Sequence, residues 1–288
     1  MPHLIGLLIV TTLFAVMVSL GLSLPLDRMQ EYGRQRGMGI RVLIGSCLLV
    51  PLVGVLVLKA PLGMSYPAKL AVALMALCPS APLTLRKAHA SGGDRGLAAL
   101  LQVSAATLAI VTVPLLALAY TEIFGISGWE ITPYQVGAQI VKAQLLPLGI
   151  GVVLRRWKPA VADRLQAPIS RIANLLLIVL IVLILVKVGP QILQFLKDDL
   201  AGLAAVVTMV VASLAMGQLL GAGAPHVRTT TALVTSMRNP GLALLLAHVY
   251  APHVKGLTLG ILSYLLLTVL ISLPYLRWRR SLAAATSG

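Results

Sequence analysis

Four basic side chains lie inside long apolar stretches of the sequence or at their edges, and these residues are the best candidates for binding chemistry. They are Arg86, Lys87, Lys142 and Arg238. A charge at the centre of a bilayer costs about 2.5–3.5 kcal/mol on insertion scales, so such a residue is a functional candidate by default. All 8 acidic residues fall in connecting segments or at the ends of apolar stretches. Since no acid is available at depth to pair with these bases, they favour contact with an anion.

Arg238 is the strongest of the four candidates because it lies near the centre of its apolar stretch. We expect it either to contact an anionic substrate or to supply a fixed positive charge to a binding site. There are two simpler alternatives. The side chain extends (snorkels) to a membrane interface, or it donates hydrogen bonds to backbone carbonyls whose usual N–H donor a nearby proline removes. Lys142, with Gln144 beside it, either faces the same region or snorkels. Arg86 and Lys87 are placed as expected for basic residues at the cytoplasmic end of a span.

Two apolar stretches are interrupted by prolines near their centres. The third contains Pro79 and Pro82, and the eighth contains Pro240 followed by Gly241. Proline removes a backbone donor and clashes with the preceding turn, so we predict that both segments unwind, near 79–82 and 238–241, and that they cross. Interrupted helices in matching positions of two halves indicate an inverted repeat and the midplane site of a transporter. The alternative is a pair of ordinary proline kinks in unrelated helices.

The two interruptions provide a candidate site for an anionic substrate. A helix N-terminus carries partial positive charge and free N–H groups, so half-helices that begin at mid-membrane favour a negative group. The candidate substrate-binding residues are Ser80, Pro82, Thr84, Gln102, Arg238, Asn239 and Pro240. We expect no catalytic residue, metal centre or cofactor, because the sequence has neither H-E-x-x-H nor G-x-S-x-G and no acid at membrane depth. A membrane enzyme is therefore the weaker alternative, and a channel would not need two crossed breaks.

The elements that position these residues are membrane helices. The sequence has 288 residues, of which 58% are hydrophobic and 11% are charged, whereas soluble domains are about 45–50% apolar and about 25% charged. This composition excludes a soluble enzyme, a secreted disulfide scaffold and a disordered protein. A span needs about 20 apolar residues, and about nine stretches provide them: 4–24, 38–58, 67–87, 97–120, 134–154, 172–190, 200–221, 229–250 and 256–276. We predict an all-α polytopic membrane protein with about nine transmembrane helices, forming a single domain over residues 1–288.

Basic residues are shared unevenly between alternate connecting segments, and this predicts the orientation. One set carries 14, namely Arg28, Arg34, Arg36, Arg41, Arg95, Arg155, Arg156, Lys158, Arg164, Arg171, Arg228, Arg277, Arg279 and Arg280. The other carries 5, namely Lys59, Lys69, Lys187, Lys197 and Lys255. The positive-inside rule then places the N-terminus outside the cell membrane and the C-terminus in the cytoplasm. This asymmetry accounts for the net charge of +15, so we expect a lipid bilayer and a small organic anion as partners, and no nucleic acid.

Several short motifs resemble the bile acid:sodium symporter family in order and spacing along nearly the whole chain. They are Val16 to Leu22, Cys78-Pro79 followed by small residues and Thr84, the pair Gly93-Asp94, and Met237 to Gly241. The resemblance implies a core domain that carries two crossed, discontinuous helices and a smaller panel domain that supports it. It also implies transport of organic anions, bile acids among them, by alternating access with sodium.

The sequence departs from the family at positions where the resemblance implies sodium ligands. Leu85, Ala98 and Val234 replace oxygen-bearing residues, and Arg238 replaces a glutamine. Sodium is a hard cation that needs oxygen ligands, and a nearby guanidinium makes cation binding electrostatically unfavourable. We therefore expect a carrier for a small or amphipathic organic anion that is not coupled to sodium. The alternative is a sodium-dependent symporter with relocated ligands: Thr84, Gln102, Thr235 and Asn239.

Overall fold

The computed structural model describes residues 2–24, 36–79, 81, 84, 87–88, 91–126 and 130–287. All regular structure in these ranges is helical. The α-helices are α1 (Pro2–Leu22), α3 (Arg36–Ile44), α4 (Val50–Lys59), α5 (Tyr66–Leu77), α7 (Arg95–Phe124), α8 (Pro133–Ile140), α9 (Leu146–Trp157), α10 (Pro159–Asp198), α11 (Leu200–Leu220), α12 (Pro225–Ser236), α13 (Pro240–Tyr250) and α14 (Leu257–Ser287). Two π-helical turns, η2 (Gly45–Leu49) and η3 (Val141–Leu145), join α3 to α4 and α8 to α9.

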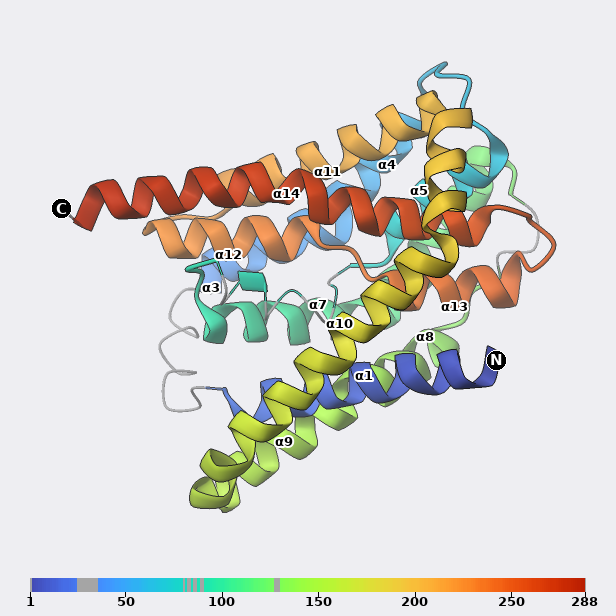
Figure 1. Ribbon diagram of the computed structural model, residues 1–288. Coiled ribbons are helices and arrows are strands. Elements are labelled where there is room, and N and C mark those ends of the chain that lie inside the picture. The colour runs from blue at the N-terminus through green and yellow to red at the C-terminus, as the bar shows by residue number, and fades with distance from the viewer. Residues whose placement is uncertain are drawn as a thin grey trace.

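The described helices have the length and the surface of membrane spans. Six stretches are long and apolar enough to cross a bilayer: Arg36–Lys59, Arg95–Phe124, Pro133–Trp157, Pro159–Asp198, Leu200–Leu220 and Leu257–Leu282. Large apolar side chains point outward from them, as on α10, where Ile178 is 58% and Val186 is 71% exposed. Contiguous apolar surface of this kind is stable against lipid and not against water. The prediction of an all-helical polytopic membrane protein is confirmed, and the two termini lie at opposite ends of the bundle (Figure 1).

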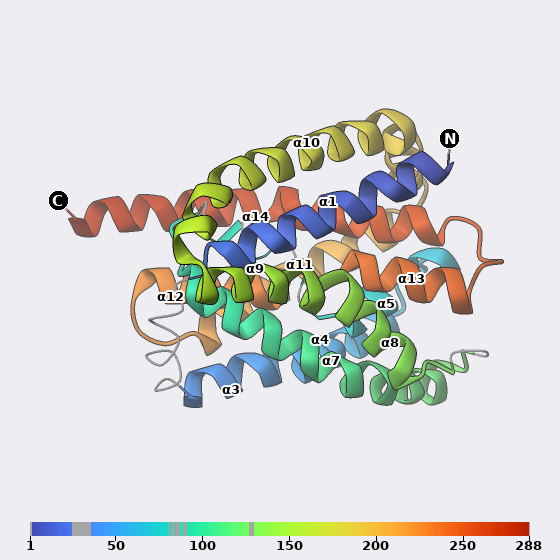
Figure 2. The same cartoon turned by 90° about the horizontal axis from the view of Figure 1, so that it is seen from below.

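The helices form two groups of neighbours, which contact each other where α8 packs on α7 and α10 packs on α14. In the first group, α1 lies against α9 and α10 (Figure 2). The backbones of α1 and α9 approach so closely that a Cβ on Gly21 would lie 2.9 Å from the Cα of Gly151. In the second group, α5 is surrounded by α4, α7, α11, α13 and α14. Every residue of α5 from Leu70 to Leu77 is at most 2% exposed, as expected for an apolar helix at the centre of a bundle.

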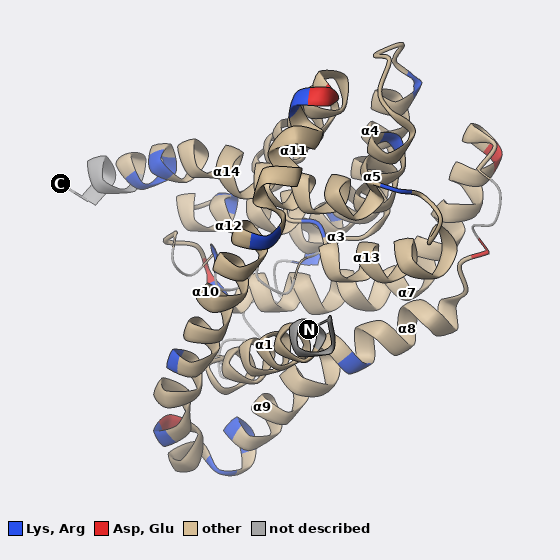
Figure 3. Cartoon of the chain, turned by 45° about the vertical axis from the view of Figure 1, so that its right-hand side comes forward, with Lys and Arg blue, Asp and Glu red and all other residues tan. Residues whose placement is uncertain are grey.

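Several helices extend beyond the apolar stretches that predicted them. The sixth stretch was bounded at 172–190, but α10 begins at Pro159, directly after the turn at Lys158. The predicted start at residue 172 is wrong because it marks only where the apolar part of the helix begins. The helix itself begins earlier, in polar sequence, with a proline at its first position. The basic C-terminal tail is likewise the last part of α14. Figure 3 shows Lys and Arg at the α9–α10 turn and near the C-terminal end of α14.

Each π-helical turn precedes a proline at the same distance along the chain. Pro51 follows η2 and Pro147 follows η3. Because proline has no N–H, the i to i+4 hydrogen bonds of the α-helix cannot continue through it. The preceding turn is instead closed by a π-helical bond between residues i and i+5. The N–H of Val50 accordingly donates to the carbonyl of Gly45. The next carbonyl, that of Ser46, would need a donor at position 51, where the proline has none.

Candidate substrate-binding site

Two extended segments meet in the interior of the second group, where α5 and α12 end. The backbone N–H of Asn239 donates to the carbonyl of Cys78 over 2.9 Å, and the N–H of Ala81 donates to the carbonyl of Met237 over 3.0 Å. The backbones of Cys78 and Met237 are both extended. These bonds satisfy polar groups that helix ends leave free, which a buried membrane segment requires. The two predicted interruptions therefore meet in space.

Arg238 lies at this crossing with its side chain 1% exposed. Its Nε donates to the carbonyl of Met75 over 3.0 Å and its Nη1 to the carbonyl of Ser46 over 2.9 Å. Its Nη2 donates to the carbonyl of Ala76. A longer contact of 3.5 Å joins Nη1 to the carbonyl of Thr235. All three guanidinium nitrogens are thus bonded to backbone oxygens, and no carboxylate of the described chain pairs with this cation.

Two prolines explain why these carbonyls accept from a side chain. In an α-helix the carbonyl of Met75 would accept from residue 79, which is Pro79. The carbonyl of Ser46 lacks its donor because of Pro51, and Ala76 lies in the last turn of α5. The guanidinium therefore supplies N–H groups that the backbone lacks. Its positive charge also lies at the C-terminal ends of α5 and α12, where the helix dipole is negative.

These contacts decide between some of the roles proposed for Arg238. The contacts agree with the predicted role in which Arg238 donates to carbonyls that the prolines leave without a donor. They also hold a positive charge at the crossing. Snorkelling to an interface is wrong, because the side chain is buried and points its nitrogens at the bundle interior. Contact between Arg238 and an anionic substrate stays a prediction.

Asn239 and Pro240 begin the second half-helix. The side-chain Oδ1 of Asn239 accepts from the N–H of Leu242 over 3.1 Å, so this residue is the N-cap of α13. Pro240 is the first residue of that helix, and the predicted unwinding of Pro240 and Gly241 is wrong. The unwound segment is Met237–Asn239 instead. Proline is favoured at a first helical position because its fixed φ suits the helix and its missing N–H is not needed there.

Thr84 and Gln102 are buried polar residues without satisfied oxygens. Thr84 is 0% and Gln102 is 2% exposed, and neither Oγ1 nor Oε1 has a hydrogen-bond partner among the described residues. The Oε1 of Gln144, on η3, is in the same condition. Buried polar atoms are normally paired, and the hydroxyls of Thr112, Ser263 and Tyr264 are further buried groups without a partner among the described residues. Two further predicted site residues, Ser80 and Pro82, lie outside the described residues, as does Leu85.

Of the other two residues of the alternative sodium site, Thr235 lies on α12 and Asn239 is the N-cap of α13. Thr235 is 0% exposed and donates its hydroxyl to the carbonyl of Thr231 over 2.9 Å. Its neighbour Val234, at the position where the resemblance implies a carboxylate, is buried in an apolar cluster with Leu97 and Leu233. The crossing therefore carries a hydrocarbon side chain at that position and a guanidinium four residues later.

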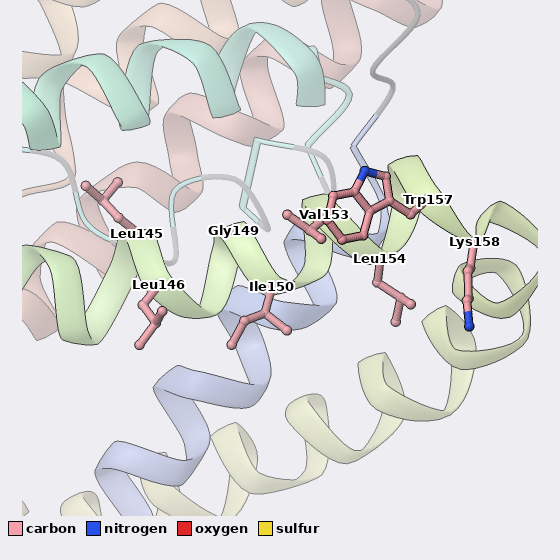
Figure 4. Close-up of a pocket in the computed structure, with 8 residues that line it drawn as sticks. All are labelled: Leu145, Leu146, Gly149, Ile150, Val153, Leu154, Trp157 and Lys158. Carbon is pink, nitrogen blue, oxygen red and sulfur yellow. The ribbon is translucent and has the colours of Figure 1, made fainter.

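A cavity lies between α7 and α9. It has a volume of about 270 Å³ and is lined by apolar residues: Leu24, Ala99, Leu100, Val103, Leu145, Leu148, Gly149 and Val152. Neither Gln102 nor Gln144 is part of this lining, although Gln102 follows Ala99 by three residues on α7 and Gln144 precedes Leu148 by four. A groove of about 630 Å³ continues along the outer side of α9 toward Trp157 and Lys158 (Figure 4). An apolar cavity with few polar groups is typical of a small-molecule site.

Sequence analysis did not identify the residues that bind Arg238. Met75, Ala76 and Ser46 contribute backbone carbonyls, and a carbonyl leaves no side-chain signature. The available signal was the position of the prolines, since Pro79 follows Met75 by four residues and Pro51 follows Ser46 by five. Each spacing identifies the carbonyl that loses its backbone N–H donor to the proline.

A polytopic helical bundle whose interrupted helices meet in its interior is typical of membrane transporters. The sequence profile of the Sodium Bile acid symporter family matches residues 10–195, which include the first interruption. The chain belongs to this family, as its motifs predicted, and is a membrane transporter. No curated protein matches the chain.

Proposed function

We propose that the protein is a secondary carrier that moves a small or amphipathic organic anion by alternating access, without sodium. The observation that carries this proposal is the position of Arg238, whose buried guanidinium binds backbone carbonyls at the crossing of the two interrupted segments. Carbonyl oxygens are the groups that a sodium ion would seek there. A guanidinium stays protonated in proteins, so its positive charge is permanent.

The tethered charge makes the crossing favourable for an anion in the way that a bound cation would. The N-terminus of α13 adds partial positive charge at the same place. Because Arg238 cannot move down a gradient, the carrier works as a uniporter or an exchanger. Val234 and Ala98, both 0% exposed, supply no side-chain oxygen that would hold sodium in addition.

In the proposed architecture, the panel consists of α1, α8, α9 and α10. The remaining helices form the core. The separate packing of α1 with α9 and α10 supports this division. We further propose about nine spans related by an inverted repeat, in which the interrupted pair α12–α13 corresponds to the segment that begins with α5. Termini at opposite ends of the bundle agree with an odd number of spans (Figure 1). By the positive-inside rule the N-terminus is outside and the C-terminus is cytoplasmic.

The substrate site in this proposal is the cavity between α7 and α9. Gln102 and Gln144 are assigned the contact with the polar group of the substrate, because their buried Oε1 atoms have no hydrogen-bond partner among the described residues. An amide turned by 180° offers N–H donors in place of its oxygen, and such a turn suits a carboxylate or a sulfonate. The apolar lining of the cavity receives the hydrocarbon part. Thr84, Asn239 and the break residues Ser80, Pro82 and Pro240 complete the proposed site.

A sodium-dependent symporter of the same family is the second candidate. The observation in its favour is that Thr84 and Gln102 have buried oxygens without partners. With the hydroxyl of Thr235 and the amide of Asn239 these oxygens would form a relocated cation site.

Counterflow in proteoliposomes tests whether the protein is a carrier. Vesicles loaded with unlabelled taurocholate, benzoate or succinate are diluted into the same labelled anion. The proposal expects saturable uptake that exceeds equilibrium transiently for one of these anions, and loss of that overshoot in Gln102→Leu. Flux that does not saturate would indicate a channel and contradict the proposal.

A further inference from the structure

A second cavity lies at the end of the bundle where α12 begins and α14 finishes, away from the crossing. Its volume is about 290 Å³, and its lining includes Ser91, Gly92, His226, Thr229, Arg279 and Arg280. These residues come from three elements: the turn before α7, the first turn of α12, and the last part of α14. The proposed transport function uses none of them.

Arg279 is the fixed cation of this cavity. Its side chain is 6% exposed, which is unusual for an arginine without a carboxylate partner. Its Nε donates to the hydroxyl of Thr229 over 3.1 Å, and its Nη2 donates to the carbonyl of Pro225 over 2.7 Å. Its Nη1 makes no hydrogen bond within the described chain. The guanidinium is therefore held in place on one edge while donors remain on the other.

The surroundings of Arg279 favour negative charge. Arg280 and the imidazole of His226 line the same cavity. The first turn of α12 has no side-chain cap, so its N-terminal charge is not neutralised. Asp94 is tied to this region by an N–H bond to the hydroxyl of Thr230 over 2.7 Å, but its Oδ1 accepts from Leu97 and caps α7. Gly92 has a φ of +73°, and a Cβ placed on it would meet no atom within 4 Å, so the wall is open there.

We propose that this cavity binds a phosphate group, carried either by an anionic lipid headgroup or by a soluble phosphate compound. A tetrahedral phosphate presents several acceptor oxygens at once, and this cavity is lined by two arginines of α14 and one histidine of α12. The guanidinium fork suits such an ion better than a single ammonium does. A volume of about 290 Å³ suits a phosphate with a small headgroup.

Occupancy of the cavity links α12 to α14. α12 carries Thr235 and leads into Arg238, so the bound phosphate would hold the half-helix that ends at the crossing. A ligand that binds only the native state raises its apparent stability. The inference does not depend on which anion the carrier transports or on sodium.

Thermal unfolding of the purified full-length protein tests the proposal with two probes. Sodium phosphate is compared with sodium chloride at equal ionic strength, and micelles with phosphatidylglycerol are compared with micelles with phosphatidylcholine. We expect at least one probe to raise the Tm by about 3 °C near saturation. A rise with phosphate indicates that the free ion suffices, and a rise with phosphatidylglycerol alone indicates a lipid headgroup.

Matched variants separate this site from general charge effects. Arg279→Gln and Arg280→Gln are expected to abolish the rise, and His226→Gln to reduce it. Arg277→Gln, an exposed arginine on the same helix outside the cavity, is expected to keep the rise. If Arg279→Gln does not fold, Arg280→Gln and His226→Gln decide the question. No rise with either probe, a rise retained by Arg280→Gln, or an equal loss in Arg277→Gln would overturn the proposal.

Discussion

The Nε of Arg238 lies 3.0 Å from the carbonyl oxygen of Met75, a residue of the opposite interrupted segment. Pro79 removes the backbone N–H that would otherwise pair with this oxygen. One guanidinium thus joins the end of α5 to the start of the break after α12. The same side chain reaches Ser46 on η2, so three elements depend on it.

Loss of Arg238 is predicted to destabilise the protein strongly. Arg238→Met would leave three buried carbonyls without donors, and each unsatisfied group costs about 1–3 kcal/mol. We expect a loss of about 3 kcal/mol or more in the free energy of unfolding, measured with denaturant in micelles. Arg238→Lys should recover only part, because one ammonium cannot reach acceptors on separate elements. Arg277→Met is the control on an exposed site, and a change there equal to that of Arg238→Met would contradict the prediction.

The effect of Arg238 is predicted to depend on the prolines that free its acceptors. Pro51→Ala restores a backbone N–H for the carbonyl of Ser46, so Arg238→Met should cost less in that background. We expect a coupling of about 1 kcal/mol in a double-mutant cycle. Pro147→Ala is the matched control, because Pro147 also follows a π-helical turn but has no contact with Arg238. Equal coupling for both prolines would show that the carbonyl at Ser46 is not the cause.

Acid is predicted to weaken the contact of Asp199, which lies between α10 and α11, with Ser65, the N-cap of α5. Its Oδ2 accepts from the N–H of Ser65 over 2.9 Å, and its Oδ1 accepts from Gly202 over 2.6 Å. Burial raises the pKa of this carboxyl, but hydrogen bonds from the side chain of Ser65 and from the backbone N–H groups of Gly202 and Ser65 lower it by more, so the net pKa lies below the ordinary value of 3.8. The stabilisation is therefore complete above that value and is lost as the pH falls below it.

Unfolding measured between neutral and acidic pH checks this prediction. Asp199→Asn should flatten the decline of stability below the ordinary pKa of the carboxyl. Asp198→Asn, at an exposed neighbour, should leave the decline unchanged. A decline that is equally steep in Asp199→Asn would refute the assignment.

The close approach of α1 and α9 is predicted to tolerate no side chain. A Cβ on Gly21 would lie 2.3 Å from the carbonyl oxygen of Leu148, and a Cβ on Gly151 would lie 2.4 Å from that of Val18. Gly21→Ala and Gly151→Ala should each cost about 1–3 kcal/mol in stability through overpacking. Gly189→Ala, where a Cβ meets nothing within 4 Å, should instead be neutral or gain up to about 1 kcal/mol. Neutral effects at all three positions would disprove the packing of α1 on α9.

Helix positions and the two interruptions follow from the sequence because hydrophobic length and proline placement are local properties. Boundaries such as the start of α10 at Pro159 do not follow from hydrophobicity, because hydrogen bonding continues into polar residues. The sequence predicts the bonding of freed backbone carbonyls as one alternative role of Arg238. It does not predict which carbonyls accept from the guanidinium. Met75 and Ser46 offer only carbonyls, and 163 and 192 residues separate them from Arg238. Such contacts depend on tertiary packing that no local pattern encodes.

The initial rate of saturable anion uptake into proteoliposomes, with sodium replaced by potassium or choline at constant ionic strength, decides whether transport depends on sodium. If the guanidinium of Arg238 takes the place of a bound cation at the crossing, the rate is expected to be the same within about twofold in all three salts. A loss of about tenfold or more without sodium would contradict the account. It would show that the chain builds a cation site from other oxygens, such as those of Thr84 and Gln102.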